Sequence, residues 1–128
     1  MTFNLLIVDD SKTVRAVIKK ALRMAGVPTN EVHEAANGQE ALEVVADHWI
    51  DLILADINMP VMNGIEMIQR LFADDSTSSI PVIVVSSEGS TTRIDELKKS
   101  NVCGYVRKPF QPEELREALL AALGNPDE

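Results

Sequence analysis

Two apolar segments of this sequence end in acidic residues, and this pattern limits the possible folds more than any other feature. Residues 5–8 read Leu-Leu-Ile-Val and run into Asp9 and Asp10, while residues 52–55 read Leu-Ile-Leu-Ala and run into Asp56. Continuous apolar runs of this length are typical of parallel strands buried on both faces. A carboxylate at the end of such a strand costs free energy unless a partner compensates its charge. We therefore expect the three acids to share one pocket.

Strand-like and helix-like segments alternate along the whole chain, and apolar residues at i, i+3, i+4 and i+7 identify the helices. The predicted strands cover residues 5–8, 31–35, 52–55, 81–85 and 104–106, and the predicted helices begin after Asp10, at Asn37, near Gly64, at Ser90 and at Pro112. The second strand is polar and alternating, as expected of an edge strand. This pattern predicts a (βα)5 α/β fold, with a doubly wound, parallel, five-stranded sheet of order 2-1-3-4-5 as in flavodoxin. Ligands of such sheets bind outside the carboxyl ends of strands one and three, where the three acids lie.

The helical spacing also predicts which side chains face the core. They are Val14, Val17, Ile18, Ala21, Leu22 and Ala25 in the first helix, Ala41, Leu42, Val45 and Trp49 in the second, Ile65, Ile68, Leu71 and Phe72 in the third, and Leu115, Ala118, Leu119, Ala122 and Leu123 in the last. The fourth helix offers only Ile94 and Leu97, so we expect it to be the least firmly docked. Gly26 is expected to cap the end of the first helix.

The composition is that of a single globular domain spanning residues 1–128, with 45% apolar residues. No apolar run approaches the roughly 18 residues of a membrane span, and the start of the chain lacks the pattern of an export signal. The only cysteine, Cys103, cannot form an internal disulfide, so we expect a reducing, cytoplasmic setting and interpret this residue as part of the core. The net charge of -8 predicts that the protein binds neither nucleic acid nor anionic membranes.

The predicted acidic pocket suits a magnesium ion. Two carboxylates about 4 Å apart repel each other by about 4 kcal/mol at an effective dielectric constant of ~20. Protonation of one acid or binding of a cation would relieve this repulsion, and Mg²⁺ prefers hard oxygen ligands. A phosphoryl donor on the same ion would have its charge neutralised and would lie in line with Asp56.

Two further strand ends supply groups that a phosphoryl transfer needs. Ser86 follows the fourth strand, and its hydroxyl is suited to donate to a phosphoryl oxygen. Lys108 follows the fifth strand, and its ammonium is suited to pair with Asp56 or with the phosphoryl group. Pro109 makes a cis peptide bond possible, which would aim the lysine inward.

With these residues in place, the sequence resembles the receiver domain of two-component response regulators, and within that family the stand-alone CheY-like regulators. The resemblance spans essentially the whole chain and rests on residues 8–10, 56–60, 63–64, 85–88 and 104–110. Each segment alone is a weak signal, but together, in order and at the ends of the right strands, they are highly specific. Small departures, such as serine rather than threonine at position 86 and asparagine rather than aspartate at position 63, concern partner specificity rather than chemistry.

The resemblance implies roles for the acidic residues. Asp56 is expected to be the phosphoacceptor. The carboxylates of Asp10 and Asp56 and the backbone carbonyl of Asn58 are expected to bind Mg²⁺, with Asp9 acting mainly through metal-bound water. Mn²⁺ is expected to substitute for Mg²⁺.

The resemblance also implies a switch. Ser86 matches the conserved hydroxyl position, Lys108 matches the conserved lysine, and Tyr105 matches the aromatic residue whose ring moves inward when the hydroxyl shifts. Asn58 and Glu88 occupy the two positions that tune the attack of water on the phosphorylated state.

We therefore expect a signalling switch rather than an enzyme. A sensor histidine kinase would supply the phosphoryl group, and a chemotaxis-like protein target would bind the face formed by helix four, strand five and helix five. We expect a monomer, with a phosphatase as a further partner. One alternative is a receiver domain cut from a longer transcriptional or enzymatic regulator.

Two alternatives belong to other functional classes. A haloacid-dehalogenase-like Mg²⁺ phosphatase also uses a strand-end aspartate, but it needs a second aspartate where this chain has Asn58. A flavodoxin-like carrier of flavin mononucleotide needs a phosphate loop where Asp9 and Asp10 would repel phosphate. The two histidines, His33 and His48, have no partner at a sequence spacing typical of metal ligands, so we interpret them as solvated or packed residues.

Overall fold

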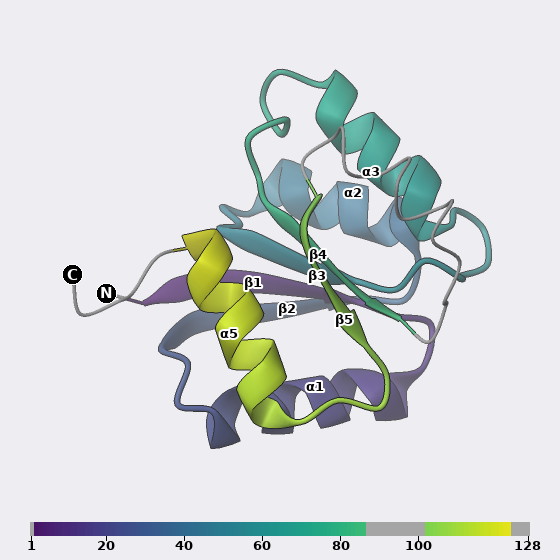
Figure 1. Cartoon of the computed structure of the whole chain (residues 1–128). Coiled ribbons are helices and arrows are strands. Elements are labelled where there is room, and N and C mark those ends of the chain that lie inside the picture. Colours follow the sequence, from purple (N-terminus) through teal and green to yellow (C-terminus); the bar gives the residue numbers. More distant parts are fainter. Residues whose placement is uncertain (1, 87–101, 124–128) are drawn as a thin grey trace.

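A parallel five-stranded sheet of order β2-β1-β3-β4-β5 forms the centre of the protein, as predicted (Figure 1). The computed structural model describes residues 2–86 and 102–123. The strands are β1 (Phe3–Val8), β2 (Thr29–Ala35), β3 (Leu52–Ala55), β4 (Val82–Ser86) and β5 (Val102–Arg107), and the helices are α1 (Lys12–Met24), α2 (Gly38–Asp47), α3 (Gly64–Ala73) and α5 (Pro112–Leu123). The fourth helix predicted from Ser90 lies outside the described residues.

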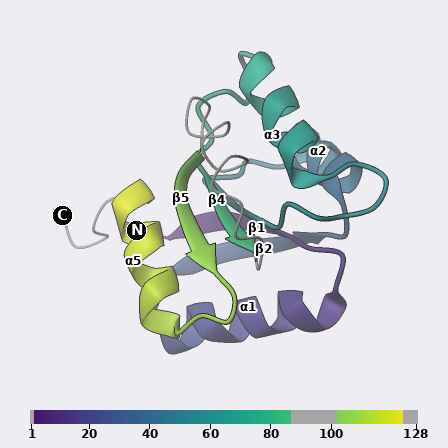
Figure 2. The same ribbon diagram turned by 45° about the vertical axis from the view of Figure 1, so that its right-hand side comes forward.

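Helices cover both faces of the sheet, with α1 and α5 on one face and α2 and α3 on the other (Figures 1 and 2). Successive side chains of a strand point to opposite faces, so each buried strand contributes to both layers of the core. In β1, Leu6 and Val8 pack on the α2 and α3 side, while Leu5 and Ile7 pack on the α1 and α5 side. All four are essentially inaccessible to solvent, which explains why this strand reads as a continuous apolar run.

The register of β1 and β3 fixes where the acidic residues lie. Val8 pairs with Ala55, so both strands end at the same level of the sheet. The main chain continues the ladder by one bond, because the Asp56 N–H donates to the Val8 carbonyl at 2.9 Å. The three acidic residues, Asp9, Asp10 and Asp56, therefore follow directly after neighbouring strand ends at the carboxyl edge of the sheet. This is the point between β1 and β3 at which the winding of the chain changes direction.

Side-chain caps begin three of the helices close to this edge. The side chains of Ser11, Asn37 and Asn63 each accept a hydrogen bond from a backbone N–H three residues later. Asn63 thus has a structural role at the start of α3. At the other end of α1, Gly26 adopts a φ of +74°, the left-handed conformation expected of a glycine after a helix.

Several side chains predicted to face the core are exposed. Val17, Phe72 and Trp49 are 53%, 49% and 78% exposed. In α3, Met67 is buried and Phe72 is not. Trp49 lies beyond the end of α2, and its indole N–H donates to Asp51. Cys103 is also exposed, contrary to our interpretation, because it lies on the edge strand β5.

No helix of the described residues is long and apolar enough to cross a membrane.

Candidate functional site

Three carboxylates meet at the carboxyl edge of the sheet, as the sequence predicted. Asp9, Asp10 and Asp56 each offer one oxygen, and these oxygens all lie within 4.8 Å of one another. Asp9 is 2% exposed and is one of two buried polar residues in the described parts of the chain, whereas Asp10 is exposed. The cluster therefore runs from the interior of the protein to its surface.

Lys108, which directly follows β5, reaches into this cluster. Its ammonium donates to Asp9 at 2.8 Å and lies 3.4 Å from the nearer Asp56 oxygen. Its backbone N–H donates to the Ser86 carbonyl at 3.0 Å, and its peptide bond to Pro109 is cis. Burial alone would lower the pKa of Lys108, but the hydrogen bond to Asp9 and the negative charges of Asp56 and Asp9 outweigh it and raise this pKa. The lysine is therefore a charged partner of both acids.

The other oxygens of the two inner acids are held by the backbone. Asp56 Oδ1 accepts from the N–H of Ile57 at 2.7 Å and from that of Asn58 at 3.4 Å. Asp9 Oδ1 accepts from the N–H of Ser11 at 2.9 Å. Three carboxylates and one ammonium still leave a formal charge of -2. Oxygen donors with an unbalanced negative charge fit a hard divalent cation such as Mg²⁺.

The loop that follows Asp56 is fixed against the helices at both ends. The N–H of Gly64 donates to the Ile57 carbonyl at 2.8 Å, and the N–H of Gly38 donates to the Met62 carbonyl at 2.9 Å. A side chain at position 64 would overlap the Asp56 carbonyl oxygen and approach the Ile57 Cα to 2.9 Å. Glycine is therefore required here because the start of α3 touches the backbone of residue 56.

The same loop contains a backbone outlier. The N–H of Met62 donates to the Pro60 carbonyl at 2.7 Å, and Val61 between them has a φ of 67°. This combination is a classic γ-turn, which is rare and strained, above all for a β-branched residue. The Val61 side chain is 83% exposed, so no packing of that side chain explains its presence.

Arg15, which no pattern in the sequence singles out, holds the main chain at Asp9. The Arg15 guanidinium donates to the Asp9 carbonyl at 2.6 Å through Nη1 and to Glu34 at 3.0 Å through Nε. Glu34 also accepts from Lys19 at 3.2 Å. Burial would raise the pKa of Glu34, but these bonds and charges outweigh it and lower this pKa. One arginine on an otherwise amphipathic helix carries no signal of such a contact, which depends on how α1 and β2 pack.

The residues predicted to form the switch lie beside the acidic cluster. Ser86 is fully buried at the end of β4, opposite Arg107 of β5. The Tyr105 hydroxyl lies 3.5 Å from the Ser86 carbonyl oxygen, and its partly buried ring packs against the core on the α2 and α3 side. Asn58 is exposed and lies in the loop that follows Asp56. Glu88 lies outside the described residues.

Known proteins with related sequences and structures identify this arrangement. The response regulator receiver domain model matches residues 5–120. Chemotaxis protein CheY1 of Helicobacter pylori is 38% identical over 124 residues, which cover 96% of this chain and 98% of that protein. Chemotaxis protein CheY-3 of Vibrio cholerae is 36% identical and covers 90% of this chain. The crystallised chemotaxis protein CheY4 of Vibrio cholerae superposes with a TM-score of 0.84 at 33% identity, covering 96% of this chain and 100% of that one.

The parallel sheet and the acidic cluster at its switch point define a CheY-like α/β protein. The chain belongs to the response regulator receiver domain family. This membership confirms the predicted resemblance and supports phosphoacceptor signalling in a two-component system as the general function.

Proposed function

We propose that Asp56 accepts a phosphoryl group from the phosphohistidine of a sensor histidine kinase and that this reaction depends on Mg²⁺. In the reaction an oxygen–phosphorus bond forms at the Asp56 carboxylate while the nitrogen–phosphorus bond of the donor breaks. The observation that supports this most is Lys108, whose partly buried ammonium spans Asp9 and Asp56 and places a positive charge beside the acceptor. An ammonium there stabilises the negative charge that develops on a phosphoryl group.

The metal would be held by the acidic cluster. The residues suited to hold it are Asp10, Asp56 and the backbone carbonyl of Asn58, with Asp9 acting through water, and Mn²⁺ would substitute. A bound Mg²⁺ would neutralise phosphoryl oxygens. The Asp9–Lys108 bond at 2.8 Å supports the view that Asp9 is the residue that positions the lysine as well.

The phosphorylated state would be read at a neighbouring face. A phosphoryl group adds a charge of about -1.5 to -2. The Ser86 hydroxyl would move toward it and vacate space for the Tyr105 ring, whose hydroxyl is close to the Ser86 backbone. The target surface would include β5, α5 and the helix predicted from residue 90. The CheY relatives support a chemotaxis-like protein partner, and Asn58 and Glu88 would set the lifetime of the phosphoryl group.

The protein would act as a switch and not as an enzyme with a turned-over substrate. It would catalyse only its own phosphorylation and dephosphorylation, assisted by a partner phosphatase. We further propose that it acts as a monomer in the cytoplasm. Asn58 in place of a second aspartate supports this function over that of a haloacid-dehalogenase-like phosphatase.

Phosphorylation by a small donor tests the proposal. Incubation with acetyl phosphate and Mg²⁺ is expected to give an acid-labile phosphoprotein, and chelation of the metal is expected to abolish it. Asp56→Asn is expected to remove the modification, whereas the control Asp51→Asn, outside the acidic cluster, is expected to retain it. Normal phosphorylation of Asp56→Asn, or turnover of p-nitrophenyl phosphate at the rates of a phosphatase, would contradict the proposal.

A further inference from the structure

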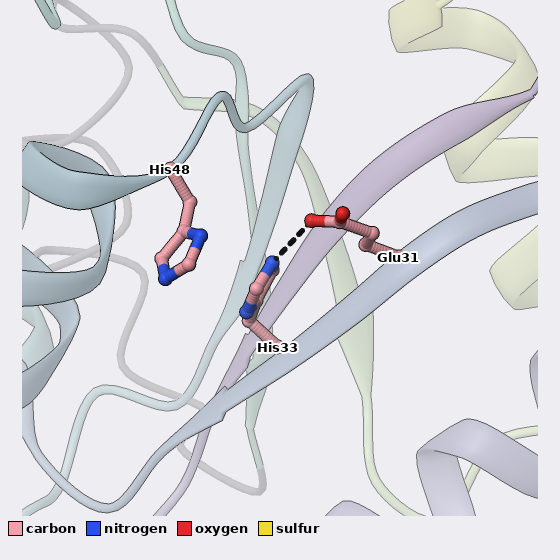
Figure 3. Close-up of side chains that lie close together, drawn as sticks. All are labelled: Glu31, His33 and His48. Atoms are coloured by element: carbon pink, nitrogen blue, oxygen red, sulfur yellow. Dashed lines mark hydrogen bonds and ion pairs between the residues drawn. The ribbon is translucent and has the colours of Figure 1, made fainter.

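The two histidines of the chain lie next to each other on the surface. The sequence contains only two, His33 and His48, and they lie far apart along it. In the structure their ring centroids are 4.2 Å apart, and Glu31 lies beside them (Figure 3). The two rings therefore pack against each other, as one of the two interpretations of these residues expected. The spacing along the sequence did not indicate this contact, because it joins a strand to the end of a helix.

The fold explains how the three residues meet. Glu31 and His33 alternate with Val32 on β2, so they share the face covered by α2, while Val32 packs on the opposite face. His48 is the cap residue directly after the end of α2. Because α2 starts near the acidic cluster and is about 15 Å long, His48 lies toward the other edge of the sheet.

The side chains present a set of metal-binding atoms. The Glu31 carboxylate lies 2.8 Å from His33 Nε2, and one ligand atom from each of the three residues lies within 4.8 Å of the others. Within the described chain, no protein group forms a hydrogen bond to the ring of His48. Figure 3 shows the two imidazoles and the carboxylate converging from β2 and the end of α2.

Two imidazoles and a carboxylate are a ligand set for a first-row transition ion. Zn²⁺ is commonly bound by two histidines and a glutamate with water in the fourth position, at about 2.0–2.2 Å from each ligand atom. A tetrahedral site of that size has ligand atoms about 3.4 Å apart, which requires small rotations from the present spacing. The Glu31 side chain is 54% exposed and His48 is exposed, so these two residues can rotate toward the more buried His33.

The surroundings also favour a cation. The carboxyl end of a helix carries partial negative charge, and the last turn of α2 contains no basic residue to balance it. The formal net charge of the chain is -8. A positive ion beside His48 would therefore interact favourably with both the end of the helix and the whole protein.

We propose that Glu31, His33 and His48 form a binding site for Zn²⁺ or a similar divalent transition ion, with water completing the coordination. This site differs from the acidic cluster in its chemistry, because imidazole nitrogens select transition ions and carboxylate oxygens alone favour Mg²⁺. A bound ion would connect the edge strand β2 to the end of α2. The proposal does not depend on the function proposed for Asp56.

Histidine ring resonances give a direct test, because each of the two signals reports on a proposed ligand. The protein labelled with ¹⁵N in histidine would be titrated with Zn²⁺ in excess Mg²⁺, so that Mg²⁺ competes with Zn²⁺ for the carboxylates of the acidic cluster. Both rings are expected to shift together and to saturate at one Zn²⁺ per protein. Rings that do not respond, or that respond separately without saturation, would overturn the proposal.

Calorimetry on variants under the same conditions tests the ligand set. His33→Asn and His48→Asn are each expected to weaken Zn²⁺ binding at least tenfold, and Glu31→Gln to weaken it severalfold. Two controls, Asp10→Asn in the acidic cluster and Cys103→Ser at the exposed thiol, are expected to leave it unchanged. If the controls abolish binding and the histidine variants do not, the ion binds elsewhere and the proposal fails.

Discussion

Replacing Lys108 by methionine tests how much the protein depends on the charge at the centre of its acidic cluster. Lys108→Met keeps most of the aliphatic stem but removes the ammonium 2.8 Å from Asp9, a carboxylate that is 2% exposed. After the change, the Asp9 carboxylate retains the hydrogen bond from the Ser11 N–H as its remaining hydrogen bond to the described residues. The variant therefore isolates the cost of a buried acid without its counter-charge.

The burial of the ion pair determines how much stability Lys108→Met is expected to lose. Removing one partner of a fully buried ion pair costs about 3–5 kcal/mol. The side chains of Lys108 and Asp56 are 20% and 13% exposed, so water reaches the pocket and reduces this cost. We expect the free energy of unfolding to fall by about 2–3 kcal/mol in urea denaturation at neutral pH without divalent ions. Lys19→Met is the matched control, because the Lys19 side chain is 41% exposed and its pair with Glu34 is worth about 0–1 kcal/mol.

Magnesium and pH extend this test. Since Mg²⁺ would replace the lost positive charge, it is expected to stabilise Lys108→Met more than the wild type. Because the pKa of Lys108 is raised in the folded protein, its charge contributes fully to the free energy of unfolding below the unfolded-state pKa of about 10.4. This contribution is lost as the pH rises through the folded-state pKa. The difference between wild type and variant should therefore be constant from about pH 6 to pH 9. A loss no larger than that of Lys19→Met, or no differential effect of Mg²⁺, would refute the reasoning.

Three other changes have expected outcomes. Gly64→Ala is expected to lower stability by about 1–3 kcal/mol in urea denaturation and to shift the amide signals of residues 56–58, because its Cβ would overlap the Asp56 backbone; an unchanged stability would contradict the close approach. Val61→Asn is expected to raise stability by about 1 kcal/mol, since asparagine tolerates a positive φ and valine does not; a loss in thermal denaturation would show that the turn is not strained. Glu34→Gln is expected to lower stability by at most about 1 kcal/mol at pH 7. Because the pKa of Glu34 is lowered, its charge contributes to stability above the unfolded-state pKa of about 4.3, and this contribution disappears as the pH falls through the folded-state pKa. The loss of stability in Glu34→Gln should therefore be present at pH 7 and smaller at pH 3.

The sheet and the acidic cluster could be predicted because both follow from strand patterns. A strand buried on both faces is a continuous apolar run, and the order of elements fixes which strand ends are neighbours. Val8 and Ala55 pair as that order requires, so Asp9 and Asp56 had to meet. The interactions of Lys108 were predictable in kind, but its shorter bond to Asp9 than to Asp56 depends on side-chain packing.

The features that the sequence did not show depend on lateral packing or on helix ends. Trp49 continues the apolar spacing of α2, but the helix ends at Asp47 and the indole turns to Asp51. The bond from Arg15 to Glu34 requires α1 to lie beside β2, which no local pattern encodes. His33 meets His48 for a similar reason, since a strand residue and a helix end come together only in the folded chain.

Identification of the modified residue is the most direct test of the central claim that Asp56 is the phosphoacceptor. The protein would be phosphorylated with acetyl phosphate and Mg²⁺, reduced with borohydride to convert an acyl phosphate into homoserine, and mapped by peptide mass spectrometry. The account predicts homoserine at position 56 and unmodified aspartate at positions 9 and 10. Homoserine at position 9 or 10, or phosphate on another residue with Asp56 intact, would contradict it.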